Sequence, residues 1–402
     1  MTDDSNLALR QAIARRIRET PQQRILFADY MEMALYHPQH GYYSTGAGIG
    51  ERGDFITSPH LSADFGEMLA EQFVQMWEML DRPVPFSLVE LGAGQGILAT
   101  DILRYLHKHY FDCFEAIAYT VVEKSAALKQ QQQQQLQGAS VQWRDLEEIR
   151  ENSITGCIFS NELFDALPVH QIAIADGQLR EVYVTLASDS DLEFKEVLGD
   201  VSTPQIANYF KRSDIQIPSP AYPDGYRSEV NLAGLDWMEN LTRRLHRGYL
   251  LTVDYGHRSD RYYSPQRSRG TLQCYYRHRY HDDPYINIGR QDITAHVDFT
   301  ALQRQGEACG APTVGLTQQG LFLMALGLGD RIAALSATDN PDSQATATGR
   351  DIATVLNRRQ TLHSLIDPLG MGKFKVLIQA KGSDAVEKGR SLQGLQAPPL
   401  RR

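Results

Sequence analysis

The clearest chemical signal in the chain is a glycine turn that directly follows an apolar run. Residues 88–100 read LVELGAGQGILAT, with Glu90 immediately before glycines at 92, 94 and 96. A turn this tight at the end of a strand requires residues without a Cβ, and it lets a ligand contact the backbone at a helix N-terminus. Dinucleotide-binding turns place the third glycine one position later, where this chain has Ile97. The spacing therefore favours S-adenosyl-L-methionine (SAM) over NAD, with expected contacts from Glu90, Gly92, Gly94 and Gly96.

Acidic residues follow the next two β-rich runs. Glu123 ends the run 118–122, where its carboxylate could accept two hydrogen bonds from ribose hydroxyls. It lies 33 residues after Glu90, more than the roughly twenty usual in nucleotide-binding folds, and the long connection 107–115 accounts for the excess. Asp145 follows the run 140–143 and could reach the adenine amino group. An Asp that begins a helix is equally well explained as an N-cap.

A third group of polar residues follows the run 156–160, in the segment SNELFDALPV at 160–169. Open α/β sheets bind ligands at this end of their strands. Methyl transfer from a sulfonium is an in-line displacement that needs alignment and sometimes a carboxylate that orients or deprotonates the nucleophile. We expect Asn161 to contact the cofactor and Glu162 and Asp165 to act in the chemistry. The alternative is that Asp165 caps a helix and Asn161 satisfies backbone groups.

Two later segments supply further polar groups. Asp254 and Tyr255 end the run 248–253, and Asp292 and His296 lie in RQDITAHVD at 290–298, where their spacing also suits a satisfied pair at the beginning of a helix. The sequence contains no HExxH, no Cys/His cluster and no GxSxG motif. Metal-assisted hydrolysis and serine acyl transfer therefore have no support, and no metal site is predicted.

The elements that must position these residues alternate in type. Short apolar, β-rich runs occur at 86–90, 118–122, 140–143, 156–160 and 248–253, and helix-like stretches separate the first four. This alternation predicts an α/β fold with βαβ units and a mostly parallel, Rossmann-like sheet. One of the helices carries six consecutive glutamines, 130–135, which we interpret as a solvated helix face.

Other segments depart from the alternation. The N-terminal part is mainly helical with a glycine-rich loop at 41–59, residues 166–230 contain short strands joined by tight turns, and the apolar pattern ends after residue 381. The sequence thus predicts five parts: a helical segment 1–85, a SAM-binding half 86–165, an inserted α+β subdomain 166–230, a second half of the core 231–381 and a loose tail 382–402.

Composition restricts the class of protein. The chain has 402 residues, of which 42% are hydrophobic and 22% charged, as in ordinary globular enzymes. A net charge of -9 gives no general attraction to nucleic acid or anionic lipid, and no apolar run approaches membrane length. Four widely spaced cysteines suit a reducing compartment, and the N-terminal residues resemble neither a secretion signal nor a transit peptide. From these features we expect a cytoplasmic protein.

The motifs, in this order, resemble those of the MidA-like SAM-dependent methyltransferases. The matching segments are 41–43, 53–59, 90–96, 161–168, 254–257, 292–298 and 319–323. The family includes bacterial members and the mitochondrial complex I assembly-factor arginine methyltransferases. The resemblance implies a class I methyltransferase fold, SAM as cofactor, symmetric dimethylation of an arginine on a complex I-type subunit, and a segment around Asp54 that folds over the cofactor cleft. One departure is His60, which stands where the family usually has Glu.

Three functions follow from this reading. In a protein arginine methyltransferase, carboxylates must localise the charge of a guanidinium whose pKa is above about 12, and Glu162, Asp165, Asp54 and Asp254 could do so. A non-catalytic SAM-binding assembly chaperone would leave its partner unmethylated. In a small-molecule methyltransferase the insertion 166–230 would close over the ligand. The segment 262–280, rich in Tyr and Arg, suits either a protein-contact surface or a packed loop.

Overall fold

The centre of the molecule is a seven-stranded sheet. The computed structural model describes residues 3–45, 57–188, 192–337, 349–389 and 391–398. The strand order of the central sheet is β16-β17-β10-β5-β2-β3-β4, with bounds β2 Phe86–Leu91, β3 Ile117–Val122, β4 Val141–Arg144, β5 Ile154–Asn161, β10 Leu245–Asp254, β16 Thr313–Gln318 and β17 Lys375–Lys381. The five strands from β10 to β4 are parallel, and β17 and β16 are antiparallel additions. The predicted α/β fold with a mostly parallel sheet is confirmed.

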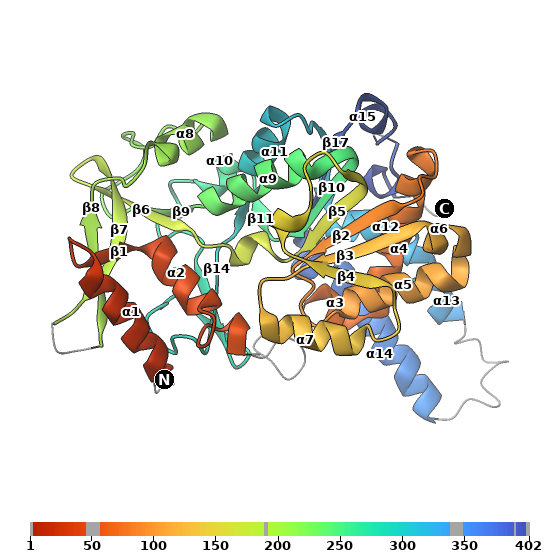
Figure 1. The fold of residues 1–402 in the computed structure, drawn as a ribbon, viewed down its shortest axis with the longest axis horizontal. Helices are drawn as coiled ribbons and strands as arrows, with labels where there is room; N and C mark the ends of the chain where they lie inside the picture. The colour runs from red at the N-terminus through yellow and green to blue at the C-terminus, as the bar shows by residue number, and fades with distance from the viewer. Residues whose placement is uncertain (1–2, 46–56, 189–191, 338–348, 390, 399–402) are drawn as a thin grey trace.

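Helices cover both faces of this sheet, because successive residues of its strands point to opposite sides. Leu88 and Leu251 pack in one core with α4 (Ala63–Met79) and α5 (Ile97–His109). Their neighbours Val89 and Leu250 pack in a second core with α9 (Leu232–Arg244) and α11 (Phe299–Ala308). Figure 1 shows the sheet between these layers. Among the described residues, no helix is both long and apolar enough to cross a membrane.

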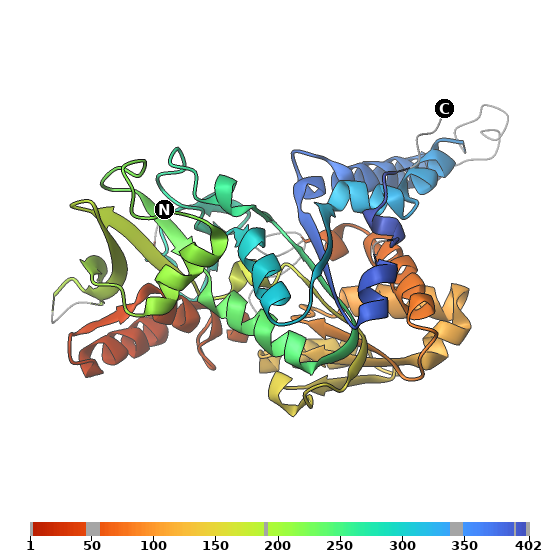
Figure 2. The ribbon, with the colours of Figure 1, turned by 90° about the horizontal axis from the view of Figure 1, so that it is seen from above.

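A second sheet lies beside the first along the long axis of the molecule (Figures 1 and 2). Its path is β1-β7-β6-β9, with β8 paired to β7, and its bounds are β1 Arg24–Leu26, β6 His170–Ala175, β7 Gln178–Leu186, β8 Phe194–Gly199 and β9 Arg227–Val230. Strand β1 pairs with β7, Ile25 opposite Val184. Helices α1 (Leu7–Glu19) and α2 (Phe27–Tyr36) pack on this sheet. The predicted segment 1–85 is therefore divided, since its first part joins the strands of 166–230 whereas α4 joins the central sheet.

Residues 256–298 follow β10 and lead to α11 through a series of short elements. They form β11 Gly256–His257, α10 Ser259–Tyr262, β12 Gln273–Tyr276, β13 Arg279–His281, β14 Asp292–Thr294 and β15 Val297–Asp298. A strand thus stands where the spacing of Asp292 and His296 suggested the beginning of a helix. Tyr262 and Tyr263 are buried in the core, whereas Tyr280 is 74% exposed. The packed-loop interpretation of 262–280 holds for its first tyrosines, whereas Gln266, Ser268, Arg269 and the β12-β13 hairpin end of the segment are on the surface.

The remaining helices complete the C-terminal side of the sheet. They are α12 Gln319–Ala325, α13 Leu328–Ala337, α14 Gly349–Ile366 and α15 Ser383–Gly389, with the 3-10 turns η5 Met371–Lys373 and η6 Gln393–Leu395. Ala385 and Leu392 are fully buried, and the backbone N–H of Gly394 donates to Gln72 Oε1 at 3.0 Å. The prediction of a loose tail is therefore wrong for the described residues after 381. Single apolar residues anchor them, and these are too sparse to give a periodic pattern.

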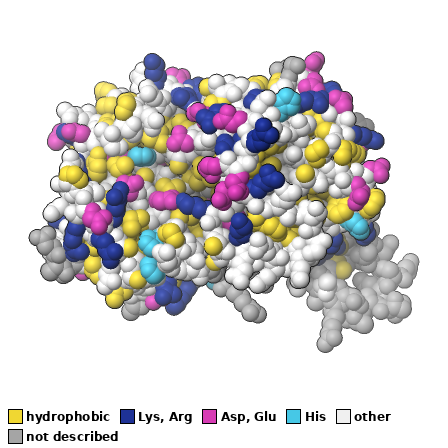
Figure 3. Space-filling view, viewed as in Figure 1, with side chains coloured by type: hydrophobic (Ala, Val, Ile, Leu, Met, Phe, Trp, Pro, Cys, Tyr) yellow, Lys and Arg dark blue, Asp and Glu magenta, His cyan; other side chains and the backbone are white. Residues whose placement is uncertain are grey.

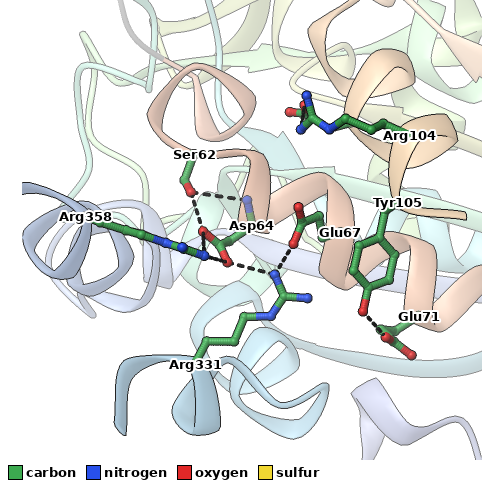
Figure 4. A network of polar contacts seen from close by, with 9 residues as sticks. Ser62, Asp64, Glu67, Glu71, Arg104, Tyr105, Arg331 and Arg358 are labelled. Carbon is green, nitrogen blue, oxygen red and sulfur yellow. Dashed lines mark hydrogen bonds and ion pairs between the residues drawn. The ribbon is translucent and has the colours of Figure 1, made fainter. Parts of the chain in front are cut away.

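A buried carboxylate ties α4 to the helices α13 and α14 (Figure 4). Asp64 accepts hydrogen bonds from Arg331 at 2.7 Å, Arg358 at 3.0 Å and Ser62 at 2.7 Å, and its side chain is only 4% exposed. Burial raises the pKa of Asp64, but the hydrogen bonds from Arg331, Ser62 and Arg358 outweigh burial and lower the pKa overall. The ionised carboxylate thus holds three helices together.

We expect Asp64→Asn to lower the free energy of unfolding at pH 7 by about 1.5 to 3 kcal/mol, because charge-assisted hydrogen bonds are lost. The matched control is Glu78→Gln, which removes an exposed pair with Arg82 and should change stability by less than about 0.5 kcal/mol. Urea titrations measure both. Since the folded-state pKa of Asp64 is lowered, its contribution is present above the unfolded pKa of about 3.9 and is lost as pH falls below it. Equal effects of the two variants would contradict this role.

Candidate functional site

The polar residues singled out in the sequence meet at one edge of the central sheet. Parallel pairing places the ends of four strands side by side, with Leu91 opposite both Val122 and Ser160, and Val253 opposite Asn161. Two cavities open there. The first, called here the glycine-turn pocket, is lined by Tyr36, Tyr43, Thr57, Pro59, His60, Glu90, Gly92, Ala93, Gly94, Gln95, Ile97, Leu98, Glu123, Leu128, Asn161, Glu162, Leu163 and Ala166.

The three glycines of the turn all have left-handed backbone, and they have different surroundings. Gly94 has φ +54°, and a Cβ built on it would meet nothing within 4 Å, so its backbone borders the open pocket. Gly92 has φ +63°, and a Cβ there would lie 2.9 Å from Leu163. Gly96 has φ +81° and faces Gln132 at 3.4 Å instead of the pocket. The turn thus offers a ligand bare backbone at Gly92 and Gly94, directly before α5, as close approach of a cofactor requires.

Two carboxylates line the glycine-turn pocket. Glu90 is buried and accepts a hydrogen bond from Tyr119 Oη at 2.7 Å. Burial raises its pKa to about 7, against the effect of the Tyr119 hydrogen bond. Glu123 accepts from the backbone N–H of Ser125 at 2.8 Å, and burial raises its pKa as well. Both carboxylates are therefore held in fixed orientations beside the pocket, where hydroxyl or ammonium donors of a ligand could reach them.

Gln132 supports two residues that line the glycine-turn pocket, and sequence reasoning missed it. It lies within the glutamine tract on α7 (Ala126–Gln135) and is fully buried. Its Nε2 donates to Gly94 O at 2.8 Å and to Glu123 Oε2 at 3.0 Å, and its Oε1 accepts from Trp143 at 3.0 Å. The solvated-face interpretation is wrong for this residue. Its position four residues after the buried Leu128 was the available signal, since both lie on one helix face.

We expect Glu123→Ala to weaken SAM binding by about 1.5 to 3 kcal/mol, roughly ten- to a hundredfold, because charge-assisted hydrogen bonds to the ribose are lost. Isothermal titration calorimetry measures the affinity. The control is Glu115→Ala, which removes the same charge from an exposed position before the opposite end of β3. Parental affinity in Glu123→Ala would show that another group binds the ribose.

Asp145 lies beside the glycine-turn pocket and does not line it. Its side chain is exposed, and its backbone N–H donates to Glu148 Oε2 at 2.9 Å, as at the beginning of a short helix. It borders an adjoining hollow that shares Glu123 and Gly92 with the pocket. The N-cap alternative thus describes its local contacts, and a contact with adenine would require the ligand to extend into this hollow.

A second cavity of about 630 Å³ lies beyond Glu162. It is lined by Glu162, Asp165, Tyr255, Gly256, His257, Arg261, Gln273, Tyr275, Asp292, Thr294, His296, Gln318, Pro368, Leu369, Lys373, Phe374 and Lys375. Glu162 also lines the glycine-turn pocket. This carboxylate therefore stands where the two cavities meet.

The local backbone fixes Glu162 at this junction. Its backbone N–H donates to Val253 O at 2.8 Å, and its φ of +52° is unusual for a residue with a side chain. Its Oε1 accepts hydrogen bonds from Asn161 Nδ2 at 2.9 Å and from the backbone N–H of Ser58 at 3.4 Å. Burial, reinforced by the neighbouring Asp165, raises the pKa of Glu162 to about 8. A left-handed backbone and a raised pKa together are typical of a functional carboxylate.

Two further carboxylates have different roles. Asp254 is fully buried and accepts from the backbone N–H groups of Phe164 at 2.9 Å and Asp165 at 3.3 Å, so it shapes the loop that carries Asp165. Asp165 lines the second cavity, and its Oδ1 has no hydrogen-bond partner among the described residues. Burial raises the pKa of Asp165 to about 6, against a hydrogen bond from Tyr255. Asp165 is thus available to a ligand, whereas Asp254 is occupied by the backbone.

The two remaining positions of interest are His60 and Asp54. His60 lines the glycine-turn pocket and contacts Thr57 Oγ1 at 2.6 Å and Gln95 Oε1 at 3.2 Å. It does not line the second cavity. Asp54 lies outside the described residues.

Comparisons with known proteins agree with this geometry. Residues 68–317 match a family model described as S-adenosyl-L-methionine-dependent methyltransferase. The chain is 31% identical over 387 residues to "Protein arginine methyltransferase NDUFAF7 homolog, mitochondrial" of Drosophila melanogaster, covering 88% of this chain and 81% of that protein. It is 29% identical to "Protein arginine methyltransferase NDUFAF7, mitochondrial" of Homo sapiens over 345 residues, 79% of this chain and 74% of that one.

A solved structure is similar over nearly the whole chain. The crystal structure of a Burkholderia thailandensis protein bound to S-adenosyl-homocysteine has a TM-score of 0.78, is 30% identical and covers 94% of each chain.

The names of the curated relatives also concern the cellular location, because these relatives are named as mitochondrial proteins. The cytoplasmic location expected from the N-terminal residues and the cysteines is therefore wrong. A targeting signal is a weak sequence pattern, so the failure to recognise one was not sufficient evidence for a cytoplasmic location.

Proposed function

The chain belongs to the family of S-adenosyl-L-methionine-dependent methyltransferases, and from this premise we propose that its acceptor is an arginine side chain of a protein. SAM, the cofactor of the family, supplies a methyl group on a sulfonium sulfur. The observation that carries the proposal is the position of Glu162, which lines both the glycine-turn pocket and the second cavity. An acceptor group in the second cavity would meet the methyl group beside this carboxylate.

The carboxylates of the second cavity suit a guanidinium. Glu162 and Asp165 both line it, and they approach from the same loop. A guanidinium presents five N–H donors in a plane and stays protonated, so two carboxylates can hold it in one orientation. Hydrogen bonds to Glu162 and Asp165 would draw its positive charge away from the nitrogen that faces the methyl group. Their pKa values, raised by burial, would fall again when the cation binds, which favours the ionised pair.

The replacement of the family's Glu by His60 is compatible with this acceptor. Because His60 lines the glycine-turn pocket and not the second cavity, an arginine could be held without it. We further propose that the acceptor protein is a complex I-type subunit and that the product is symmetric dimethylarginine. Similarity to proteins named arginine methyltransferase supports the arginine, and the motifs shared with the complex I assembly-factor methyltransferases support the subunit.

The test is to incubate the purified chain with methyl-labelled SAM and an extract of cells that lack their own copy. The labelled protein band is then digested, and mass spectrometry identifies the modified residue. Label on an arginine, as dimethylarginine with both nitrogens modified, is the expected result. Label on a small molecule or on another residue type would overturn the arginine proposal. Retained SAM binding with no label in any fraction would favour the non-catalytic chaperone.

A further inference from the structure

The second cavity is lined by side chains of both charges. Its lining includes the carboxylates of Glu162, Asp165 and Asp292 and the cations of Arg261, Lys373 and Lys375, and of these only Glu162 also lines the glycine-turn pocket. Arg261 comes from α10, more than a hundred residues before Lys373 at the end of η5 and Lys375 at the beginning of β17. The fold therefore brings them together at this cavity.

The three cations are not held in direct ion pairs within the described part of the chain. No ion pair there includes Arg261, Lys373 or Lys375. Their field is visible on a neighbour: burial lowers the pKa of His257 to about 4, and Arg267, Arg261, Lys375 and Lys373 lower it further. Basic and acidic side chains are mixed over the face shown in Figure 3.

Cations that are not ion-paired in a concave site attract an anionic group. The carboxylates of the same cavity repel such a group, so it would bind at the three cations while a cation binds beside Glu162. Only an acceptor that carries both charges a short distance apart satisfies both sets of side chains. In an extended peptide, residues one to four positions apart are separated by roughly 4 to 14 Å, so one short segment can carry both charges.

We propose that the acceptor segment carries an Asp or Glu within about four residues of the target arginine, and that Arg261, Lys373 and Lys375 bind this carboxylate. The proposal rests on the proposed arginine methyltransferase function and adds a sequence requirement to it. These cations act in recognition, because they line the second cavity and not the glycine-turn pocket. Charge-assisted hydrogen bonds of this kind fix the register of a bound peptide as well as its affinity.

The test uses the full chain, labelled SAM and C-terminally amidated peptides that contain one arginine in a neutral background. One Glu is moved through the four positions on either side of the arginine, and each peptide is paired with its Gln counterpart. We expect kcat/KM to be at least about tenfold higher for Glu than for Gln in one or two registers. The variant Lys373→Glu, changed at an exposed side chain of the cluster, should lose this preference and accept Lys at the same register.

Matched controls separate the possible failures. Lys211→Glu makes the same charge reversal at an exposed position on α8 (Pro204–Ser213) that does not line the cavity, and it should keep the parental Glu preference. Arginine methylation with equal kcat/KM for Glu and Gln in every register would overturn the inference and leave the proposed function standing. If no peptide is methylated on arginine in any register, both the inference and the proposed function are overturned.

Discussion

Replacing Glu162 by Gln should slow methyl transfer at least about a hundredfold while SAM binds as tightly as in the parent, because a positioned acid or base typically contributes a factor of this size. Glutamine has nearly the same shape, and its side-chain oxygen can still accept the hydrogen bonds from Asn161 and Ser58 that Glu162 Oε1 receives. What is lost is the negative charge at the junction of the two cavities. An interaction made mainly in the transition state lowers the rate and spares ground-state affinity.

The pH dependence of the same variant gives a second readout. Burial raises the pKa of Glu162 to about 8, with Asp165 adding to the effect. Below that pH the free enzyme holds a neutral side chain, which binds a guanidinium poorly, so kcat/KM should rise with pH through this region. The rise should be absent in Glu162→Gln, since the titrating group has been removed.

A suitable control is Glu229→Gln, which removes another buried carboxylate, one held by Thr271 and lining neither cavity. It tests whether loss of a buried charge alone reduces the rate. A parental rate in Glu162→Gln would assign Glu162 a structural role and make Asp54 the better candidate. A collapse of SAM binding would place Glu162 among the cofactor contacts.

The part of the site that could be predicted lies at the ends of parallel strands. Each of β2, β3, β5 and β10 is a short apolar, β-rich run, and parallel pairing brings the residues after them to one edge whatever the details of packing. Glu90, Glu123 and Glu162 could therefore be grouped from local sequence alone. The glycine turn could also be predicted from local sequence, because a left-handed backbone conformation favours glycine.

The rest of the site depends on tertiary packing. Gln132 is buried against Gly94 and Glu123, yet its neighbours in the tract are also glutamines, so residue type alone gave no signal. Outside the site, strand β1 of the second sheet was not predicted either, because its three residues are too few for a recognisable period. Lys373 reaches the second cavity through a short turn that precedes β17. Such convergence of distant segments is fixed by how helices and sheets pack, which no local pattern records.

Replacing Gly94 by Val should weaken SAM binding at least about a hundredfold, or roughly 2.7 kcal/mol, in a protein that still folds. A Cβ at Gly94 would meet no protein atom within 4 Å, and the residue lines the glycine-turn pocket. The valine side chain can therefore be accommodated by the protein, and it occupies space that the cofactor needs. Calorimetry with SAM measures the loss, and thermal unfolding reports whether the fold persists.

The backbone strain of this substitution must be separated from its effect on the pocket. Gly94 has φ +54°, where a residue with a Cβ costs about 1 to 2 kcal/mol. Gly177, in the turn between β6 and β7, has φ +67°, also has no atom within 4 Å of a built Cβ, and does not line the pocket. Gly177→Val should therefore lower stability by a similar amount and leave SAM affinity unchanged. If both variants bind SAM like the parent, the backbone at Gly94 does not meet the cofactor. If both lose affinity equally, the loss comes from strain in the fold and the contact at Gly94 is not required.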